Sequence, residues 1–199
     1  AIDAVPRPKT LRTLDWTENG VFWRATLMTL APSASASPYA WLVDRQTQLD
    51  NNWFDALRNA LNQIKRADTQ RIVVSPTEIK VGISAIFGDS AKSFATDWCV
   101  VHGDLQWSNV TAPELMILDW ENWGWAPRGY DAARLIAYAG LVPSVQDRLM
   151  RLFADDLQSH SGQVSLLLAI AMVQNDIVAG HADPSLTASL NRLAKTIGR

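Results

Sequence analysis

Three side chains with oxygen donors follow one another closely in the middle of the chain: Asp104, Asn109 and Asp119. Asp104 and Asn109 lie five residues apart in one polar segment, and Asp119 follows the apolar run 115–118. Carboxylate and amide oxygens are hard ligands of the kind that Mg²⁺ prefers, and a further carboxylate can accept the proton of a hydroxyl group. Phosphoryl transfer asks the protein mainly for positioning and charge stabilisation. The spacing therefore indicates metal-assisted phosphoryl transfer.

The three residues divide this work between them. In kinase-type phosphoryl transfer, an Asp base and an Asn metal ligand five residues later share one loop, and a second metal-binding Asp follows on a nearby strand end. By this pattern Asp104 would orient the attacking hydroxyl and accept its proton, while Asn109 and Asp119 would bind the metal. The sequence thus predicts one catalytic residue and two metal ligands.

The residues around these three extend the pattern from 98 to 131. A β-prone run, 98–101, leads into His102-Gly103-Asp104, and Asp119 opens an Asp-aromatic-Glu sequence. Pro127-Arg128-Gly129-Tyr130-Asp131 follows, which is similar to a Pro-x-x-Asp sequence with one more residue between Pro and Asp. A His-Gly-Asp triplet alone carries little information, since Gly-Asp turns are common. Agreement over the whole segment is more specific. With Gly rather than Arg after the His, it resembles the aminoglycoside phosphotransferase and choline kinase branch of the kinase-like fold.

This resemblance implies the reactants and the roles of further residues. It implies ATP as the phosphoryl donor, Mg²⁺ as the metal, and a small-molecule hydroxyl as the acceptor. The backbone of Thr29, Leu30 and Ala31 would bind adenine at the hinge between two lobes. His102 would pack at the base of the catalytic loop, and Asp131 would cap its helix and brace that loop.

Composition narrows the class of protein. With 48% hydrophobic and 19% charged residues, the 199-residue chain has the make-up of an ordinary globular protein of one domain or two small ones. A net charge of −2 gives no basic surplus for nucleic acid. One cysteine, Cys99, excludes an internal disulfide and a cysteine-rich zinc site. The longest apolar run, 164–173, is too short to cross a bilayer, and no signal peptide is visible, so we expect a cytoplasmic protein without a membrane partner.

The first thirty-eight residues predict a hairpin and a linker. Two β-prone runs, 11–16 and 21–30, flank Glu18-Asn19-Gly20, and Asn-Gly between such runs is a strong hairpin signal. Residues 32–38, rich in Ala, Ser and Pro, form the clearest boundary in the chain.

After this boundary the pattern is mainly helical. Apolar residues at three- and four-residue spacing predict a helix over 49–66. Ser75-Pro76-Thr77-Glu78 is a capping box that starts a second helix. Residues 97–127 hold the catalytic strands and loops, including a strand before Asp119. Further helices are expected near 130–141, 144–158, 162–179 and 185–196. The helix at 130–141 is apolar on nearly every face apart from Arg134, which predicts burial.

Together these elements predict an α+β fold, mostly helical. Under the resemblance it is a protein-kinase-like C-terminal lobe preceded by a β-hairpin remnant of the N-terminal lobe. Residues 1–31 would be the hairpin and hinge, 32–38 the linker, and 39–199 the helical lobe that carries catalysis and the substrate.

Three parts of a complete kinase-like nucleotide site are not visible: a phosphate-covering Gly-rich loop, a strand Lys, and a helix Glu that holds the Lys. None of the ten glycines is part of a Gly-x-Gly sequence. Lys9 is explained more simply as a solvated loop residue than as the strand Lys. We therefore expect the catalytic lobe of a longer phosphotransferase, with a segment of the N-terminal lobe missing, that by itself is inactive and binds ATP weakly. The alternative is a degenerate, non-catalytic module that binds a ligand or partner. The joint presence of Asp104, Asn109 and Asp119 favours the enzyme.

The acceptor is left open by the sequence. A polycationic aminoglycoside would need carboxylates around it, and the candidates are Glu121, Asp155, Asp156 and Asp176. Asp155 and Asp156 are explained more simply as the solvated edge of a helix. An amino alcohol, an amino acid or a sugar hydroxyl remains equally possible.

Tryptophan is unusually frequent near the catalytic segment. Four of the nine tryptophans crowd around it, namely Trp107, Trp120, Trp123 and Trp125. They could stack on a ligand, but packing of the loops onto the core is at least as good an explanation.

Overall fold

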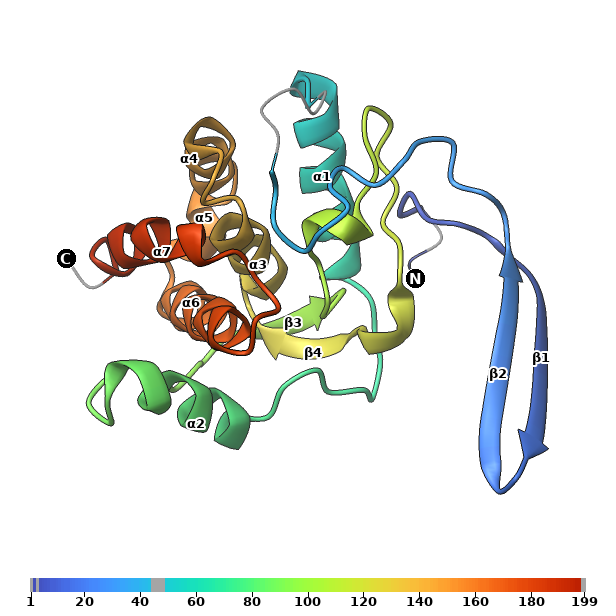
Figure 1. Cartoon of the computed structure of the whole chain (residues 1–199), viewed down its shortest axis with the longest axis horizontal. Helices are drawn as coiled ribbons and strands as arrows, with labels where there is room; N and C mark the ends of the chain where they lie inside the picture. Colours follow the sequence, from blue (N-terminus) through green and yellow to red (C-terminus); the bar gives the residue numbers. More distant parts are fainter. Residues whose placement is uncertain (1, 3, 44–48, 198–199) are drawn as a thin grey trace.

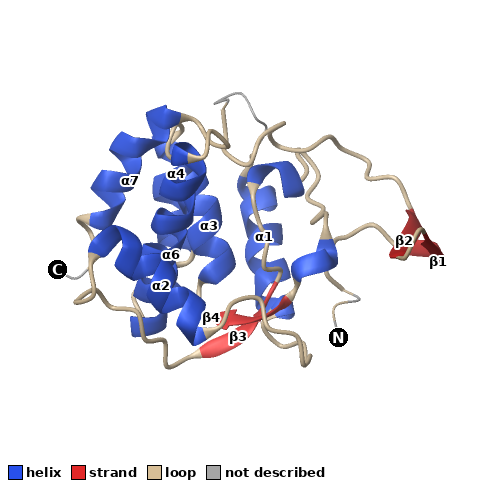
Figure 2. Cartoon of the chain, turned by 60° about the horizontal axis from the view of Figure 1, so that its bottom comes forward, coloured by secondary structure: helices blue, strands red, loops and turns tan. Residues whose placement is uncertain are grey.

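The computed structural model describes residues 2, 4–43 and 49–197, and it shows a helical body from which one β-hairpin projects (Figure 1). The helices make up 45% of the chain, and there are two small antiparallel sheets, β1–β2 and β3–β4. Figure 2 places the β3–β4 pair along one side of the helices and the hairpin far from them. The predicted α+β class is confirmed.

The hairpin forms as predicted, from β1 (Thr10–Glu18) and β2 (Val21–Met28). At its turn, Asn19 and Gly20 have φ angles of 51° and 76°, which match the right-handed twist of the strands in a two-residue turn. Next to the turn, Trp16 lies opposite Trp23 with ring centroids 6.2 Å apart. Such cross-strand pairs are the main stabilising contacts of a two-stranded sheet.

Both faces of the hairpin are open to solvent. Every residue of β1 and β2 is exposed, among them Leu11, Phe22 and Leu27, each more than 60% accessible. A two-stranded hairpin without a covered face is marginally stable in water. Further contacts to the apolar surface of the hairpin would therefore stabilise it.

The predicted linker is fixed to the body rather than free. Ala36 N donates to Val110 O over 2.7 Å, and Ala112 N donates to Ala34 O over 3.1 Å. Ser37 is buried, and its N–H donates to Trp107 O. The segment from the hairpin thus lies along the catalytic segment before the chain turns into the helices.

Two helices with clear start signals come next. The first, α1 (Asn51–Ile64), is capped by the Asp50 side chain, which accepts from Trp53 N, and buries an apolar face as predicted. The second, α2 (Pro76–Phe87), begins with the predicted capping box between Ser75 and Glu78.

The second sheet holds the catalytic segment between its strands. β3 (Trp98–Val101) and β4 (Gly124–Pro127) pair antiparallel, with two short 3-10 turns between them, η1 (Trp107–Asn109) and η2 (Trp120–Asn122). The prediction of a strand at 115–118 is wrong, because this segment forms only one isolated bridge, between Val110 and Ile117. Pro113 lies in the short connection and has no N–H with which to extend a ladder.

The rest of the body is helical. It comprises α3 (Tyr130–Tyr138), α4 (Pro143–Leu152), α5 (Ala154–Leu157), α6 (His160–Val178), η3 (Pro184–Leu186) and α7 (Thr187–Ala194). All nine residues of α3 are buried, as predicted. The helix expected over 144–158 instead breaks at Phe153, whose side chain is buried and whose backbone leaves helical geometry at φ −110° and ψ 21°.

One described helix, α6, is long and apolar enough to cross a membrane by those measures alone. An 18-residue window of this 19-residue helix has a mean hydropathy of 1.2, and the helix, expected near 162–179, includes the apolar run singled out in the sequence. However, 61% of that window is buried inside the protein, where α6 packs against α2, α3, α5 and α7. These contacts are those of a central core helix.

Candidate active site

The start of the catalytic loop is held by a buried carboxylate. Asp131, on α3, accepts hydrogen bonds from His102 N over 2.7 Å and from Gly103 N over 3.0 Å. Gly103 has φ +88°, and a Cβ there would lie 2.4 Å from Asn122 O, so only glycine fits. The predicted bracing role of Asp131 is therefore present. The capping role is not, because Gly129 occupies the N-cap of α3 and no side-chain hydrogen bond caps it.

His102 has a structural role, as predicted. It is fully buried, and its Nε2 donates to Leu118 O over 2.8 Å. Burial lowers the pKa of His102, so the ring is neutral at physiological pH. Its ring meets Trp120 edge-on with centroids 4.9 Å apart. These contacts join the start of the catalytic loop to the segment that leads to Asp119.

The carboxylate of Asp104 is held from both sides. Arg134 donates to Asp104 Oδ1 over 2.7 Å, and Asn109 Nδ2 lies 3.3 Å from Oδ2 and 2.9 Å from the Asp104 backbone oxygen. The Arg134 side chain is 7% accessible, whereas that of Asp104 is 26% accessible. Asp104 is thus fixed in orientation and still open to a reactant. The Asn109 amide points its nitrogen at Asp104, which leaves its oxygen to face elsewhere.

Asp119 lies beside Asn109 through a backbone contact. Leu118 N donates to Asn109 O over 2.8 Å, so the two segments run next to each other where Asp119 begins. Asp119 itself is in the left-handed region at φ 59° and ψ 69°, a conformation that costs a non-glycine residue about 1 kcal/mol and recurs at functional sites. The structure therefore brings all three predicted residues into one loop region.

The donor set at Asn109 and Asp119 fits Mg²⁺. One amide oxygen and one carboxylate are hard donors, and Mg²⁺ usually keeps several waters besides one or two protein ligands. Within residues 2, 4–43 and 49–197 no group of three or more His, Cys, Asp and Glu could hold a metal ion. A metal that demands such a ligand set would not suit this part of the chain.

Two pockets open on either side of the catalytic loop. One, of about 330 Å³, is lined by Asp104, Arg134 and Asn122 together with residues 71–73. The other, of about 550 Å³, lies between the hairpin and the body and is lined by Asp119 and by β2 residues. Arg71 lines both pockets. The two pockets therefore adjoin at Arg71.

The pocket beside Asp119 is rich in arginine, which sequence reasoning missed. Arg7, Arg24 and Arg71 all line it. Arg24 forms a two-pronged ion pair with Asp15 across the hairpin, and the guanidinium of Arg71 donates to Glu121 O. The three arginines come from separate segments, so no local motif could have revealed them.

Arg134 is a further residue that the site adds. A charged side chain within an otherwise apolar, buried helix was the available signal, because buried arginines have partners. The sequence did not show that the partner would be Asp104.

Thr29, Leu30 and Ala31 remain a prediction. They follow β2, where Thr29 N donates to Lys9 O over 2.9 Å and Leu30 is 93% accessible. Among the described residues that line the pocket beside Asp119, the hairpin contributes Met28 but none of these three.

The acidic candidates for binding a polycation do not surround Asp104. Asp156 pairs with Lys65, Asp176 accepts from the Tyr138 hydroxyl, and Asp155 is exposed on α5. Glu121 lines the pocket beside Asp119.

The tryptophans near the motif are engaged in packing. Trp107 is buried and stacks on Trp53 with centroids 6.0 Å apart, and its Nε1 donates to Leu135 O. Trp120 Nε1 donates to Ile117 O and Trp125 Nε1 to Thr69 O. Trp123 packs partly buried against the core.

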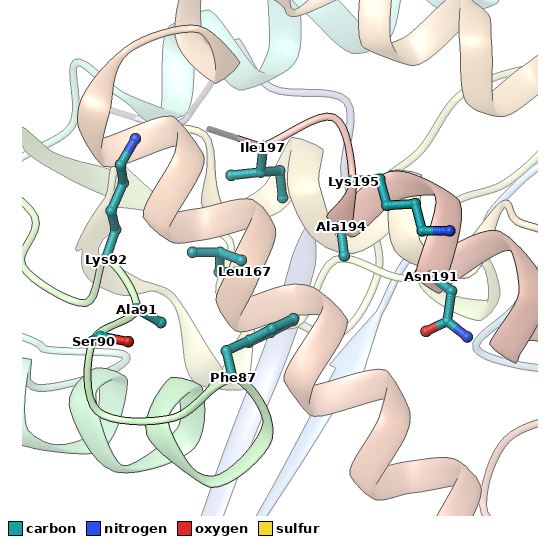
Figure 3. A pocket seen from close by; sticks show the side chains of 9 residues that line it. All are labelled: Phe87, Ser90, Ala91, Lys92, Leu167, Asn191, Ala194, Lys195 and Ile197. Atoms are coloured by element: carbon teal, nitrogen blue, oxygen red, sulfur yellow. The ribbon is translucent and has the colours of Figure 1, made fainter. Parts of the chain in front are cut away.

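A larger cavity, of about 610 Å³, lies elsewhere, where α6, α7 and the end of α2 meet (Figure 3). Phe87, Leu167 and Ile197 form its apolar part, and Lys92 and Lys195 lie at its sides. None of the predicted site residues lines it, so size alone does not locate the chemistry.

Comparison with known proteins agrees with the loop geometry. The model of the phosphotransferase enzyme family matches residues 26–162, which include β3, the catalytic loop, β4 and α3. No match was found among curated proteins or among solved structures.

Proposed function

The chain belongs to the phosphotransferase enzyme family, and from this premise we propose that it is the catalytic lobe of an enzyme that transfers the γ-phosphoryl group of ATP to the hydroxyl of a small molecule. The observation that carries the proposal is the arrangement of Asp104. Its carboxylate is fixed by Arg134 and Asn109, opens into a pocket, and lies one loop away from Asp119.

In the proposed reaction, Asp104 accepts the proton of the acceptor hydroxyl as its oxygen bonds to the γ-phosphorus. The bond from the γ-phosphorus to the β–γ bridging oxygen breaks, and ADP leaves with that oxygen. Arg134 keeps the base aimed at the acceptor pocket through its 2.7 Å contact with Asp104 Oδ1. Fixed geometry of this kind accounts for much of the rate in phosphoryl transfer.

Asn109 and Asp119 would hold the Mg²⁺ ion. The ion, when bound, neutralises charge on the phosphates. The chain prepares for it by directing the Asn109 amide nitrogen toward Asp104 and by holding Asp119 next to Asn109 through the contact between Leu118 N and Asn109 O.

The nucleotide would occupy the pocket between the hairpin and the body. Arg7, Arg24 and Arg71 give it positive charge where a strand Lys and a Gly-rich loop are not visible in the sequence. In this proposal the hairpin is the end of an N-terminal lobe whose other strands would cover its exposed apolar faces. The hinge residues Thr29, Leu30 and Ala31 would contact adenine. Support for the lobe comes from the exposure of every residue in β1 and β2.

The proposal is tested by following ³²P from γ-labelled ATP to a panel of hydroxyl compounds, in the presence of Mg²⁺. The wild-type enzyme with its complete N-terminal lobe should label at least one member, whereas the 199-residue chain alone is expected to label none. Asp119→Ala should lose labelling by about 100-fold or more, since the phosphates lose their metal. The matched control is Asp55→Ala, at an exposed carboxylate of α1 that pairs with Arg58.

If wild type labels no acceptor while Asp119→Ala and Asp104→Ala retain full binding of ligands, the enzyme reading fails. The fold would then serve as a binding module without catalysis.

A further inference from the structure

An apolar groove adjoins the pocket that holds Asp104. It has a volume of about 460 Å³, and Ile72, Pro76, Trp98 and Trp125 form most of its wall. Ile72 also lines the pocket of Asp104, so the groove and that pocket border the same side chain. A molecule whose hydroxyl reaches Asp104 can therefore place the rest of its body in the groove.

The groove is rigidly built. Residues 71–73 run beside β4, with Val73 N donating to Trp125 O and Trp125 N donating to Arg71 O, both over 2.9 Å. The indole nitrogen of Trp125 donates to Thr69 O over 2.7 Å, and that of Trp98 donates to Ala95 O over 3.2 Å. Since both indole N–H groups are already used, the tryptophans offer apolar ring surface to a ligand. A preformed apolar wall also costs little ordering entropy on binding.

The wall of the groove remains exposed in the folded chain. Ile72 is 69% accessible to solvent. It lies between the groove, which two tryptophans line, and the polar pocket of Asp104. A large apolar side chain at the mouth of a site, rimmed by polar groups, is a common mark of a ligand-binding surface.

The charges around the two spaces argue against a cationic acceptor. The described residues that line them include Arg71 and Arg134 on the positive side and Asp104 on the negative side. Asp104 is already paired with Arg134, and no second carboxylate is among the described residues that line the two spaces. The charge of Arg71, whose guanidinium donates to the neutral backbone oxygen of Glu121, is therefore not cancelled there. A polycation would meet repulsion here, whereas a neutral or anionic compound would not.

We propose that the acceptor is a hydroxyl compound with a bulky apolar body and no net positive charge, which places the hydroxyl at Asp104 and the apolar body against Ile72, Trp98 and Trp125. This inference rests on the proposed function, and it names the class of substrate for that same site.

The test measures binding directly, without nucleotide. Titrations followed by ligand-detected NMR compare 3-phenyl-1-propanol, which has an apolar body, with glycerol, which has none, and with kanamycin, a polycation. We expect saturable binding of the phenyl alcohol and weaker binding of the other two. Ile72→Ser should weaken the binding of the phenyl alcohol about 10-fold, the usual scale for removing apolar contact in a pocket.

The control is Val178→Ser, at the end of α6, where an 88% accessible side chain lines neither space. It should leave the affinity unchanged. Tighter binding of kanamycin than of the phenyl alcohol, or equal effects of the two substitutions, would overturn the inference.

Failure of this inference and failure of the proposed function look different. Transfer of phosphate to kanamycin without binding of the phenyl alcohol overturns the substrate class and leaves the phosphotransferase standing. Binding that is sensitive to Ile72→Ser, together with no transfer to any alcohol, overturns the phosphotransferase and leaves the ligand class standing.

Discussion

The hairpin and the catalytic loop are held in place by different means. The hairpin of β1 and β2 is exposed on both faces and is stabilised by pairs within itself, such as Trp16 with Trp23. The loop between β3 and β4 is tied to α3 by Asp131 and Arg134, and His102 at its start is fully buried. The body of the protein therefore fixes the proposed acceptor side of the site at Asp104, whereas the proposed nucleotide side depends on where the hairpin lies.

This difference matters for the proposed chemistry. The proposed base Asp104 and the proposed ligand Asn109 are held by the well-packed region, so their geometry is set before any reactant binds, whereas Asp119 is exposed on the side of the hairpin pocket. The arginines of the other pocket come partly from the hairpin, because Arg24 lies on β2. Acceptor binding should thus be robust, and nucleotide binding should respond to anything that moves the hairpin.

The largest expected effect concerns the base. Asp104→Asn keeps the shape of the side chain but removes its ability to accept a proton, so turnover should fall by about 10² to 10⁴. The affinity for Mg·ATP should change little, because a base acts on the transition state. Steady-state kinetics and calorimetry check the two parts, with circular dichroism as a control for folding. A variant that keeps more than a tenth of its turnover would remove Asp104 from the role of base.

A pair of thiols compares the two regions directly. Burial raises the pKa of Cys99, on β3, to about 12, far above the value of about 8.5 for a free thiol. Since the thiolate is the reactive form, Cys99 should react with Ellman's reagent at pH 8 about 1,000-fold more slowly than an exposed thiol.

The exposed reference is Leu14→Cys, on β1, in a Cys99→Ala background. Leu14 is 55% accessible. In guanidinium chloride the two thiols should react alike. Equal rates in the folded protein would mean that β3 opens as readily as the hairpin.

Two glycines with left-handed backbones provide a smaller contrast. Gly103→Ala should destabilise the body by about 2–5 kcal/mol, because the backbone strain adds to overlap with Asn122 O. Gly20→Ala, in the hairpin turn, has the same kind of strain but nothing within 4 Å of the added Cβ. Its effect on the unfolding of the body should stay below about 1 kcal/mol. Urea denaturation of both variants, followed by far-UV circular dichroism, makes the comparison, and similar losses in the two would show that hairpin and body unfold together.

Local patterns predicted the elements that local physics decides. The Asn-Gly turn, the capping box of Ser75 and Glu78, and the buried helix around Arg134 all form as expected. The expected strand before Asp119 did not form, since a ladder needs a partner and Val110 with Ile117 supplies one bridge only. The helix break at Phe153 was also not predicted. The spacing of apolar residues does not show at which residue packing in the core makes the backbone leave helical geometry.

At the candidate site, spacing singled out three residues that the structure places in one loop region, but it did not predict the side chains that contact them. Asp104, Asn109 and Asp119 share a short stretch of sequence, so a motif could reveal them. Arg71 and Arg134 reach the same place from distant segments, as does the wall around Ile72. A single sequence carries no record of such long-range contacts, which is why the acceptor pocket could not be described in advance.

The hydrogen bonds donated by the indole nitrogens of Trp53 and Trp107 have a consequence for the order in which parts of the protein fold. Trp53 Nε1 donates to Thr111 O across 58 residues, and Trp107 Nε1 donates to Leu135 O across 28 residues. Contacts between residues so far apart in the sequence close large loops. The chain loses conformational entropy when such a loop closes, and the stabilising contacts form only afterwards. The catalytic loop should therefore reach its final shape only after α1 and α3 have docked on it, and a peptide of residues 98–127 alone would carry the motif without its geometry.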